Sequence, residues 1–218
     1  MRYIAFKETV GSLAAHDNFD LMDYSEFLSM SKNVKEKAGE GSEPFPGTLL
    51  KPMKKNVNLQ LEVLELLIKY YHNAYGISFV TLSNIHKSPS NSILVLPKVN
   101  LFARLRLGAE VFGSTFSPRY TRSANILAQF VLDDDNTTDT YPGQVQFFFE
   151  HTIYLPEVGP TTHYLAFVRW YEAADERKSR FHCQIDRDGA NITNVELWKK
   201  KFYELSRDCI IPIHNILG

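Results

Sequence analysis

The side chains best suited to metal or acid–base chemistry are histidines and cysteines in the second half of the chain. They are His151, His163, His182, Cys183, Cys209 and His214. Cys209 and His214 have a spacing that can hold zinc, but His182 and Cys183 are neighbours on a predicted strand and point to opposite faces. Because no CxxC or HxxxH pair is present, we expect no metal site and interpret both cysteines as buried structural residues.

Motifs of common catalytic centres are absent. The chain has no G-x-S-x-G elbow, no G-x-x-x-x-G-K-[ST] loop and no G-x-G-x-x-G loop. Asp133–Asp135 is interpreted as a solvated turn, because the other ligands of a calcium loop are missing. We therefore expect a protein that is not an enzyme and uses no cofactor or small-molecule substrate. An enzyme in which His163, His182 or His214 meets a carboxylate is the remaining alternative.

Positive charge gathers between residues 98 and 125. Only Glu110 opposes the basic residues there, which are Lys98, Arg104, Arg106, Arg119 and Arg122. Arg104 and Arg106 share one face of a predicted strand, where they can meet phosphates. The segment thus predicts either DNA binding through Arg104, Arg106, Arg119 and Arg122, or a solvated outer sheet face balanced by the acidic turn nearby. Lys199–Lys201 forms a second, short basic cluster.

Aromatic residues provide a second candidate binding site. Residues 98–218, for which we predict a small β-barrel, contain more aromatic residues than such a barrel must bury, including Tyr141, Phe148, Trp170, Tyr171, Trp198 and Tyr203. Several aromatic rings around a concavity can hold a methylated ammonium group by cation–π attraction. We take Tyr141, Phe148, Trp170 and Tyr171 as the candidate ligand-binding set. The alternative is that these rings close the ends of the barrel.

The composition is that of a folded protein without a membrane-spanning segment. The chain has 218 residues, of which 44% are hydrophobic and 22% charged, so it can bury a core. A net charge of −1 argues against general attraction to phosphate. No apolar run approaches the roughly 18–20 residues of a membrane span, and the first residues do not resemble a secretory signal. Two cysteines suggest a reducing compartment.

Residues 1–97 are predicted to form a helical region with loops. The best pattern runs from Asn56 to Tyr75, with Asn56 as N-cap and Gly76 just after the helix. Its apolar face is expected to contain Val57, Leu61, Leu64, Ile68, Tyr71 and Tyr75, widened by Val63 and Leu67. A weaker helix is predicted over Tyr24–Lys37, and loops over Ala38–Gly47 and His86–Ser92.

Residues 98–218 are predicted to form an antiparallel β-barrel. Segments rich in β-branched and aromatic residues indicate strands at Ile93–Leu96, Leu101–Leu107, Asn125–Leu132, Gln144–Leu155, Tyr164–Tyr171 and Arg180–Ile185. The connections are mostly too short for parallel crossovers. A helix is predicted at Val195–Leu205, and a last strand at Cys209–Leu217, broken by Pro212. The expected fold class is α+β, mainly β, with the N-terminal helical region packed on the barrel.

Alternation within two of these strands predicts their surroundings. In Gln144–Tyr154, the face with Val145, Phe147, Phe149, His151 and Ile153 is expected inside, and the face with Gln144, Gln146, Phe148, Glu150 and Thr152 outside. His163–Tyr171 is apolar on both faces, which is typical of a central strand. The two strands are expected to form a hairpin. Arg169 then needs a carboxylate or carbonyl partner.

Two segments resemble a known family. AFVRWYEAAD, at 166–175, is similar to the core strand of bromo-adjacent homology (BAH) domains, and YPGQVQFFFEH resembles the strand that precedes it. NVELWKKKFYELSRDCIIPIHNILG, at 194–218, looks like the closing segment of that family. The resemblance implies a BAH-like β-barrel that binds protein partners in chromatin, in some members histone tails. Trp170 and Tyr171 match the family's strand motif.

A second resemblance covers most of the chain. PFPGTLLKPMKKNV, EVFGSTFS, YPGQVQFFFEHT, FVRWY and SRDCIIPIHNILG are similar to the C-terminal region of uncharacterised, transposon-related proteins of early-diverging fungi. Together the resemblances imply a non-enzymatic interaction module that binds chromatin or another protein partner, located in the nucleus or otherwise in the cytoplasm. A transposon-derived remnant that binds DNA through the basic strand face is the alternative.

Overall fold

The computed structural model describes residues 41–42, 47–87, 89–120, 122–131, 138–156, 158–173, 181–185, 191–196 and 198–217. The chain divides into two compact units. The larger contains Lys37–Tyr171 and Lys201–Gly218, and the smaller contains Met1–Glu36 and Glu172–Lys200. The domain boundary predicted at residue 97 falls inside the larger unit. The helix predicted at Tyr24–Lys37 lies outside the described residues.

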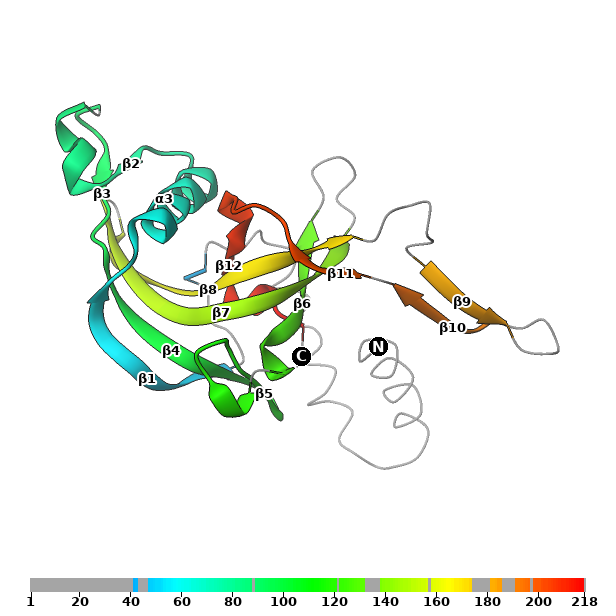
Figure 1. The fold of residues 1–218 in the computed structure, drawn as a ribbon. Coiled ribbons are helices and arrows are strands. Elements are labelled where there is room, and N and C mark those ends of the chain that lie inside the picture. Colours follow the sequence, from blue (N-terminus) through cyan, green and yellow to red (C-terminus); the bar gives the residue numbers. More distant parts are fainter. Residues whose placement is uncertain are drawn as a thin grey trace, which may run out of the picture. The chain divides into compact units, whose positions relative to one another are not determined.

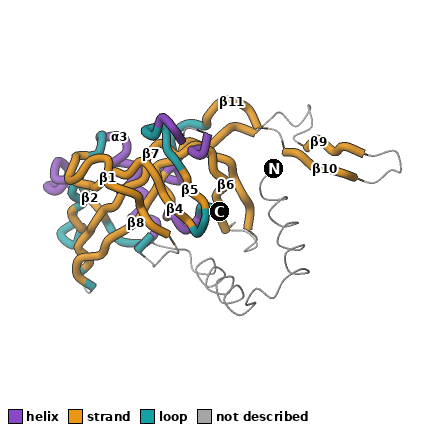
Figure 2. Tube along the Cα trace, turned by 90° about the horizontal axis from the view of Figure 1, so that it is seen from below, coloured by secondary structure: helices purple, strands orange, loops and turns teal. Residues whose placement is uncertain are grey.

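The described part of the chain is mainly β, as predicted (Figures 1 and 2). Its strands are β1 (Gly47–Asn58), β2 (Phe79–Val80), β3 (Ile93–Leu94), β4 (Lys98–Leu107), β5 (Glu110–Phe112), β6 (Asn125–Val131), β7 (Thr138–Leu155), β8 (Gly159–Ala173), β9 (Phe181–Ile185), β10 (Asn191–Glu196), β11 (Trp198–Phe202) and β12 (Ile210–Pro212). The α-helix is α3 (Leu61–Tyr75). Short 3-10 helices are η1 (Leu82–Lys87), η2 (Pro118–Tyr120), η3 (Arg122–Ala124), η5 (Arg207–Cys209) and η6 (Ile213–Asn215).

One large sheet organises the larger unit. Its order is β1-β4-β7-β8-β11, with β5 added to β4, β6 to β7 and β12 to β8. β4 pairs antiparallel with β1 and β7, and β7 pairs antiparallel with β8, so the predicted antiparallel character of the sheet is confirmed. Among the described strands, β1 and β11 end the order without pairing with each other, so the predicted closure into a barrel is not confirmed. β2 and β3 form a small parallel pair, and β9 and β10 a hairpin in the smaller unit.

β7 and β8 form the predicted hairpin, and β8 is the predicted central strand. Residues directly opposite on antiparallel strands point to the same face. Phe149 is opposite Leu165 on one face, and Phe148 is opposite Ala166 on the other; all four are fully buried. The prediction that Phe148 faces solvent is therefore wrong. A register shift between Val145 and Phe147 also interrupts the alternation on which that prediction depended.

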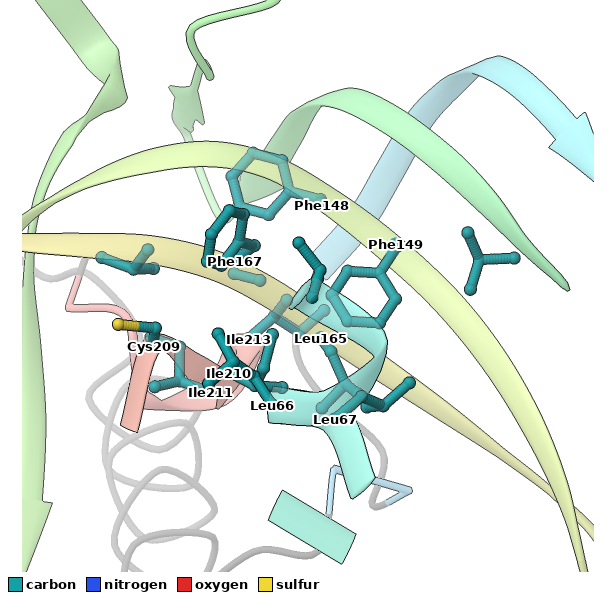
Figure 3. Close-up of a cluster of buried hydrophobic side chains, with 14 of the residues drawn as sticks. Leu66, Leu67, Phe148, Phe149, Leu165, Phe167, Cys209, Ile210, Ile211 and Ile213 are labelled. Carbon is teal, nitrogen blue, oxygen red and sulfur yellow. The ribbon is translucent and has the colours of Figure 1, made fainter. Parts of the chain in front are cut away.

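α3 packs against one face of this hairpin. Its Leu66 and Leu67 lie among Phe149 and Leu165 of the sheet and the buried isoleucines near the C-terminus (Figure 3). Gly76 ends the helix with a left-handed φ of 65°, as predicted, and its N–H donates to the His72 carbonyl. The buried face contains Val63, Leu64, Leu66, Leu67 and Tyr71.

The predicted start of this helix is wrong. Asn56 lies in β1, and the residue that precedes the helix is Gln60. Leu61, expected on the buried face, is 65% exposed. β1 itself was not predicted, because its sequence GTLLKPMKKNVN lacks strand alternation and contains proline and three lysines. Pairing with β4 nevertheless holds Gly47–Asn58 in a strand.

Gly41 and the C-terminal segment cover the outer edge of β8. Tyr164 N–H donates to the Gly41 carbonyl, Ile210–Pro212 pair with Leu165–Phe167, and Tyr203 N–H donates to the Trp170 carbonyl. The helix predicted at Val195–Leu205 is wrong, because strands β10 and β11 occupy most of that stretch. The last strand predicted at Cys209–Leu217 is limited to β12, with 3-10 helices on either side.

Candidate nucleic-acid interface

The paired strands β1 and β4, here called the β1–β4 ribbon, carry the most one-sided charge in the described sheet. The two strands contain six basic residues and no aspartate or glutamate. The six are Lys51, Lys54, Lys55, Lys98, Arg104 and Arg106. Five of the six are exposed, and Arg104 is half-buried. Sequence reasoning included the basic residues of β4 but missed the three lysines of β1, since β1 was not recognised as a strand.

The register of the β1–β4 ribbon shows which of its basic residues share a face. Arg104 is opposite Leu50 and Arg106 is opposite Thr48, so both arginines project on the same face beside β1. Lys54 is opposite Leu101 farther along the ribbon, and Leu101 points to the other face of β4 from Arg104 and Arg106. The cations therefore extend along both faces of the paired strands and do not converge on one point.

The backbone of β1 is irregular at its basic residues. The register shifts between Pro52 and Lys54 and again between Lys54 and Val57. Lys51 and Asn56 have positive φ values of 38° and 52°, uncommon for residues other than glycine. The Asn56 N–H donates to the Asn100 side-chain oxygen at 3.0 Å, which secures one of these turns. Because of these register shifts, the side chains of Lys54 and Lys55 do not follow the strict alternation of a regular strand.

Arg119 and Arg122 lie outside the β1–β4 ribbon. Arg119 is in η2 and Arg122 in η3, in the connection from β5 to β6, and both are exposed. The Gly113 N–H donates to the Ser123 carbonyl, which ties this connection to the end of β5. Because β5 pairs with β4, the connection is anchored to the sheet next to the arginines of β4. Glu110 of β5 is exposed and is opposite Leu107.

The predicted aromatic site is mostly core. Phe148 is fully buried and Trp170 is 9% exposed. The Trp170 indole N–H donates to the Asp208 carbonyl at 2.8 Å. Phe130 packs edge-on against both Trp170 and Tyr141, with ring centroids 5.3 and 5.8 Å apart. Trp170 thus lies in a filled core and not beside an open aromatic concavity.

Tyr171 is separated from the other three candidates. It follows Trp170 on β8 and so points to the opposite face. Its ring stacks on Phe202 at 4.8 Å, and its hydroxyl donates to the Asn125 side-chain oxygen at 2.8 Å. Arg169 donates to the Tyr203 carbonyl at 3.4 Å and lies over the Phe202 ring, so it has the carbonyl partner predicted for it. Tyr141, Phe148, Trp170 and Tyr171 therefore do not form one cage.

A buried cluster of histidines and tyrosines joins α3 to the hairpin. The Tyr71 hydroxyl is 2.8 Å from His151 Nδ1, and the Tyr75 hydroxyl is 2.6 Å from His163 Nε2. Burial lowers the pKa of the His151 imidazole. Burial also raises the pKa of the Tyr71 hydroxyl, with the neighbouring tyrosines as smaller causes. Sequence reasoning placed His151 on the inner face but did not connect it with these tyrosines.

Of the candidate metal ligands that the structure describes, His151 and His163 are cross-strand neighbours, and Cys209 lies in another element. His151 and His163 belong to the cluster with tyrosines, and Cys209 is buried in η5. Burial raises the pKa of the Cys209 thiol, which keeps it protonated at neutral pH. Within the described ranges, no group of three or more histidine, cysteine, aspartate or glutamate side chains could hold a metal ion. The side chains of His182 and Cys183, and the turn at Asp133–Asp135, lie outside the description.

Comparison with known proteins adds no assignment. No family model, no curated protein and no solved structure matches this chain. Among the described helices, none has the length and apolar character needed to cross a bilayer.

Proposed function

We propose that this chain binds the phosphate backbone of DNA through the β1–β4 ribbon, without catalysing a reaction. The observation that carries the proposal is the set of six basic residues on two paired strands that have no acidic residue. Lysine and arginine contacts to phosphate supply the sequence-independent part of DNA affinity. With a net charge of only −1 for the chain, the attraction must come from a local concentration of positive charge such as this one.

A competing explanation of the β1 lysines is protection of a sheet edge. β1 ends the strand order, and exposed edge strands often contain lysine, proline and bulges that prevent pairing with another chain. Edge protection accounts for Lys51, Lys54 and Lys55. It does not account for Lys98, Arg104 and Arg106, because β4 lies between β1 and β7. The basic residues of β4 therefore favour a ligand over edge protection alone.

The test is a fluorescence anisotropy titration of a labelled DNA duplex at low salt. The variant K54E/K55E/R106E should weaken binding by at least about tenfold, since three attractive charges become repulsive. The matched control is Lys69→Glu, which reverses an exposed lysine on α3. Equal affinities of the triple variant and wild type, or no binding by wild type at low salt, would refute the proposal.

Binding of a protein partner is the second candidate function. The BAH resemblance suggests this function. Closure of the sheet into a barrel and binding of a histone tail are parts of the same proposal. It is favoured by large apolar side chains that the described surface leaves exposed. These include Leu61, Leu82, Leu96, Tyr154 and Val158. A nuclear location and a transposon-derived origin likewise remain predictions from the sequence resemblance.

A parallel pull-down separates the two functions. Immobilised histone-tail peptides and immobilised duplex DNA are each incubated with the full chain and with K54E/K55E/R106E. If the chain binds DNA, the wild-type protein should be retained on the immobilised duplex and the variant should not. If the chain binds a protein partner, both the wild-type protein and the variant should be retained on a histone-tail peptide.

A further inference from the structure

Two histidines face each other beneath α3. His151 of β7 and His163 of β8 are direct cross-strand partners, and both are at most 1% exposed. The Tyr71 ring of α3 lies 5.6 Å from the His151 ring and 4.8 Å from the His163 ring, measured between centroids. Tyr75 packs edge-on against His163 at 5.8 Å. One turn of α3 therefore packs directly against the two imidazole rings.

The hydrogen bonds of His151 fit its neutral form. Its Nε2 is 2.8 Å from the Leu96 carbonyl oxygen, which can only accept, so Nε2 carries the proton and donates. Its Nδ1 is then the acceptor for the Tyr71 hydroxyl. Neutral His151 of β7, with its ring proton on Nε2, therefore hydrogen-bonds both to α3 and to the connection between β3 and β4.

A second proton would disrupt this arrangement. Protonated Nδ1 can no longer accept from Tyr71, whose hydroxyl is buried and would need a new acceptor. Among the described residues, the titratable groups in ring contact around the site are Tyr70, Tyr71 and Tyr75 from α3 and His163 from β8, and none of these is a carboxylate. Glu150, next to His151, is opposite Tyr164 on the other face.

We propose that α3 is a proton-sensitive latch, held on the sheet while His151 and His163 are neutral and released when they take up protons in mild acid. Release exposes the face of β7 and β8 that the helix covers. The direction follows from linkage: the docked state resists the proton, because burial lowers the pKa of His151. Docking is therefore complete above the ordinary histidine pKa of about 6.5 and weakens as the pH falls below it.

Hydrogen–deuterium exchange of the full chain tests the latch. Amide protection is measured at about pH 7.5 and about pH 5.5, after correction for intrinsic exchange rates. The equilibrium constant for opening of the Leu61–Tyr75 amides should increase as the pH falls below the histidine pKa. The increase should be up to about tenfold per pH unit for each proton taken up. The amides of Val145–Ile153 should keep their protection, because the hydrogen bonds of β7 are made to β8 and not to the helix.

Glutamine variants identify which histidine takes up the proton that releases the helix. In His151→Gln the amide N–H can donate to Leu96 and the amide oxygen can accept from Tyr71, but no proton can be taken up. His151→Gln should weaken the pH dependence of α3, and H151Q/H163Q should abolish it. His86→Gln, at an exposed histidine of η1, is the matched control and should behave as wild type.

NMR of the wild-type imidazoles keeps the test decisive if the glutamine variants do not fold. Protonation of His151 should coincide with loss of α3 protection. The latch is refuted if His151 is protonated while α3 stays fully protected. It is also refuted if a folded H151Q/H163Q variant keeps the pH dependence of wild type.

Discussion

At the scale of single residues, the structure separates aromatic side chains that build the core from those that contact solvent. Trp170 and Tyr154 lie on the two strands of one hairpin, yet Trp170 is 9% exposed and Tyr154 is 72% exposed. The sequence could identify both as strand aromatics. It could not identify Phe130 as the ring that covers Trp170, because that contact joins residues 40 positions apart in the chain.

The assignment of Trp170 to the core predicts a large effect on stability. Trp170→Ala should lower the free energy of unfolding by about 3–5 kcal/mol, because it leaves a cavity beside Phe130. Tyr154→Ala, the matched exposed position, should change it by less than about 0.5 kcal/mol. Urea unfolding followed by circular dichroism measures both. Similar stabilities of the two variants would contradict a filled core at Trp170.

At the scale of elements, periodicity predicted the long apolar strands and failed where pairing overrides local pattern. β7 and β8 were identified because apolar and aromatic residues run through them and a short turn joins them. The pattern does not predict β1, because its sequence lacks strand alternation and contains Pro52 and three lysines. The pattern of residues 195–205 predicts a helix, yet β10 pairs with β9 and β11 with β8. Strand propensity depends on such neighbours, which a single sequence does not reveal.

The end of α3 gives a prediction about backbone conformation alone. A Cβ at Gly76 would meet no atom within 4 Å, but the residue has a φ of 65°. Gly76→Ala should therefore cost about 1–2 kcal/mol in the free energy of unfolding, from left-handed strain without a steric clash. Gly76→Asn should cost less, since asparagine tolerates this conformation. Chemical denaturation of the two variants checks the order, and equal costs would argue against a left-handed C-cap.

The edge position of β1 predicts a second role for its lysines. Replacing Lys54 and Lys55 with valine should promote association between chains, because an apolar edge strand can pair with another copy. The variant K54E/K55E should stay as monodisperse as wild type, since either sign of charge protects an edge. Light scattering during incubation compares the three proteins. If the valine variant remains monodisperse, the register shifts of β1 are sufficient to protect the edge.

At the scale of the whole molecule, charge is balanced overall but unevenly placed. The chain has 24 basic and 25 acidic residues, and the β1–β4 ribbon holds six of the basic ones with no acidic residue. Composition alone predicted the balance, and the segment from 98 to 125 predicted part of the basic surface. The addition of Lys51, Lys54 and Lys55 required knowledge of which strand pairs with β4.

This distribution predicts how DNA affinity should depend on salt. Each lysine or arginine that neutralises a phosphate releases counterions, so the plot of log K against log salt concentration has a slope of about −0.9 per contact. Single neutralising variants of the β1–β4 ribbon, Lys54→Ala and Arg106→Ala, should each make the slope shallower by up to about one unit. Lys69→Ala, on α3, should leave it unchanged. A slope that Lys69→Ala alters as much as Arg106→Ala would mean that binding depends on the charge of the whole molecule and not on the β1–β4 ribbon.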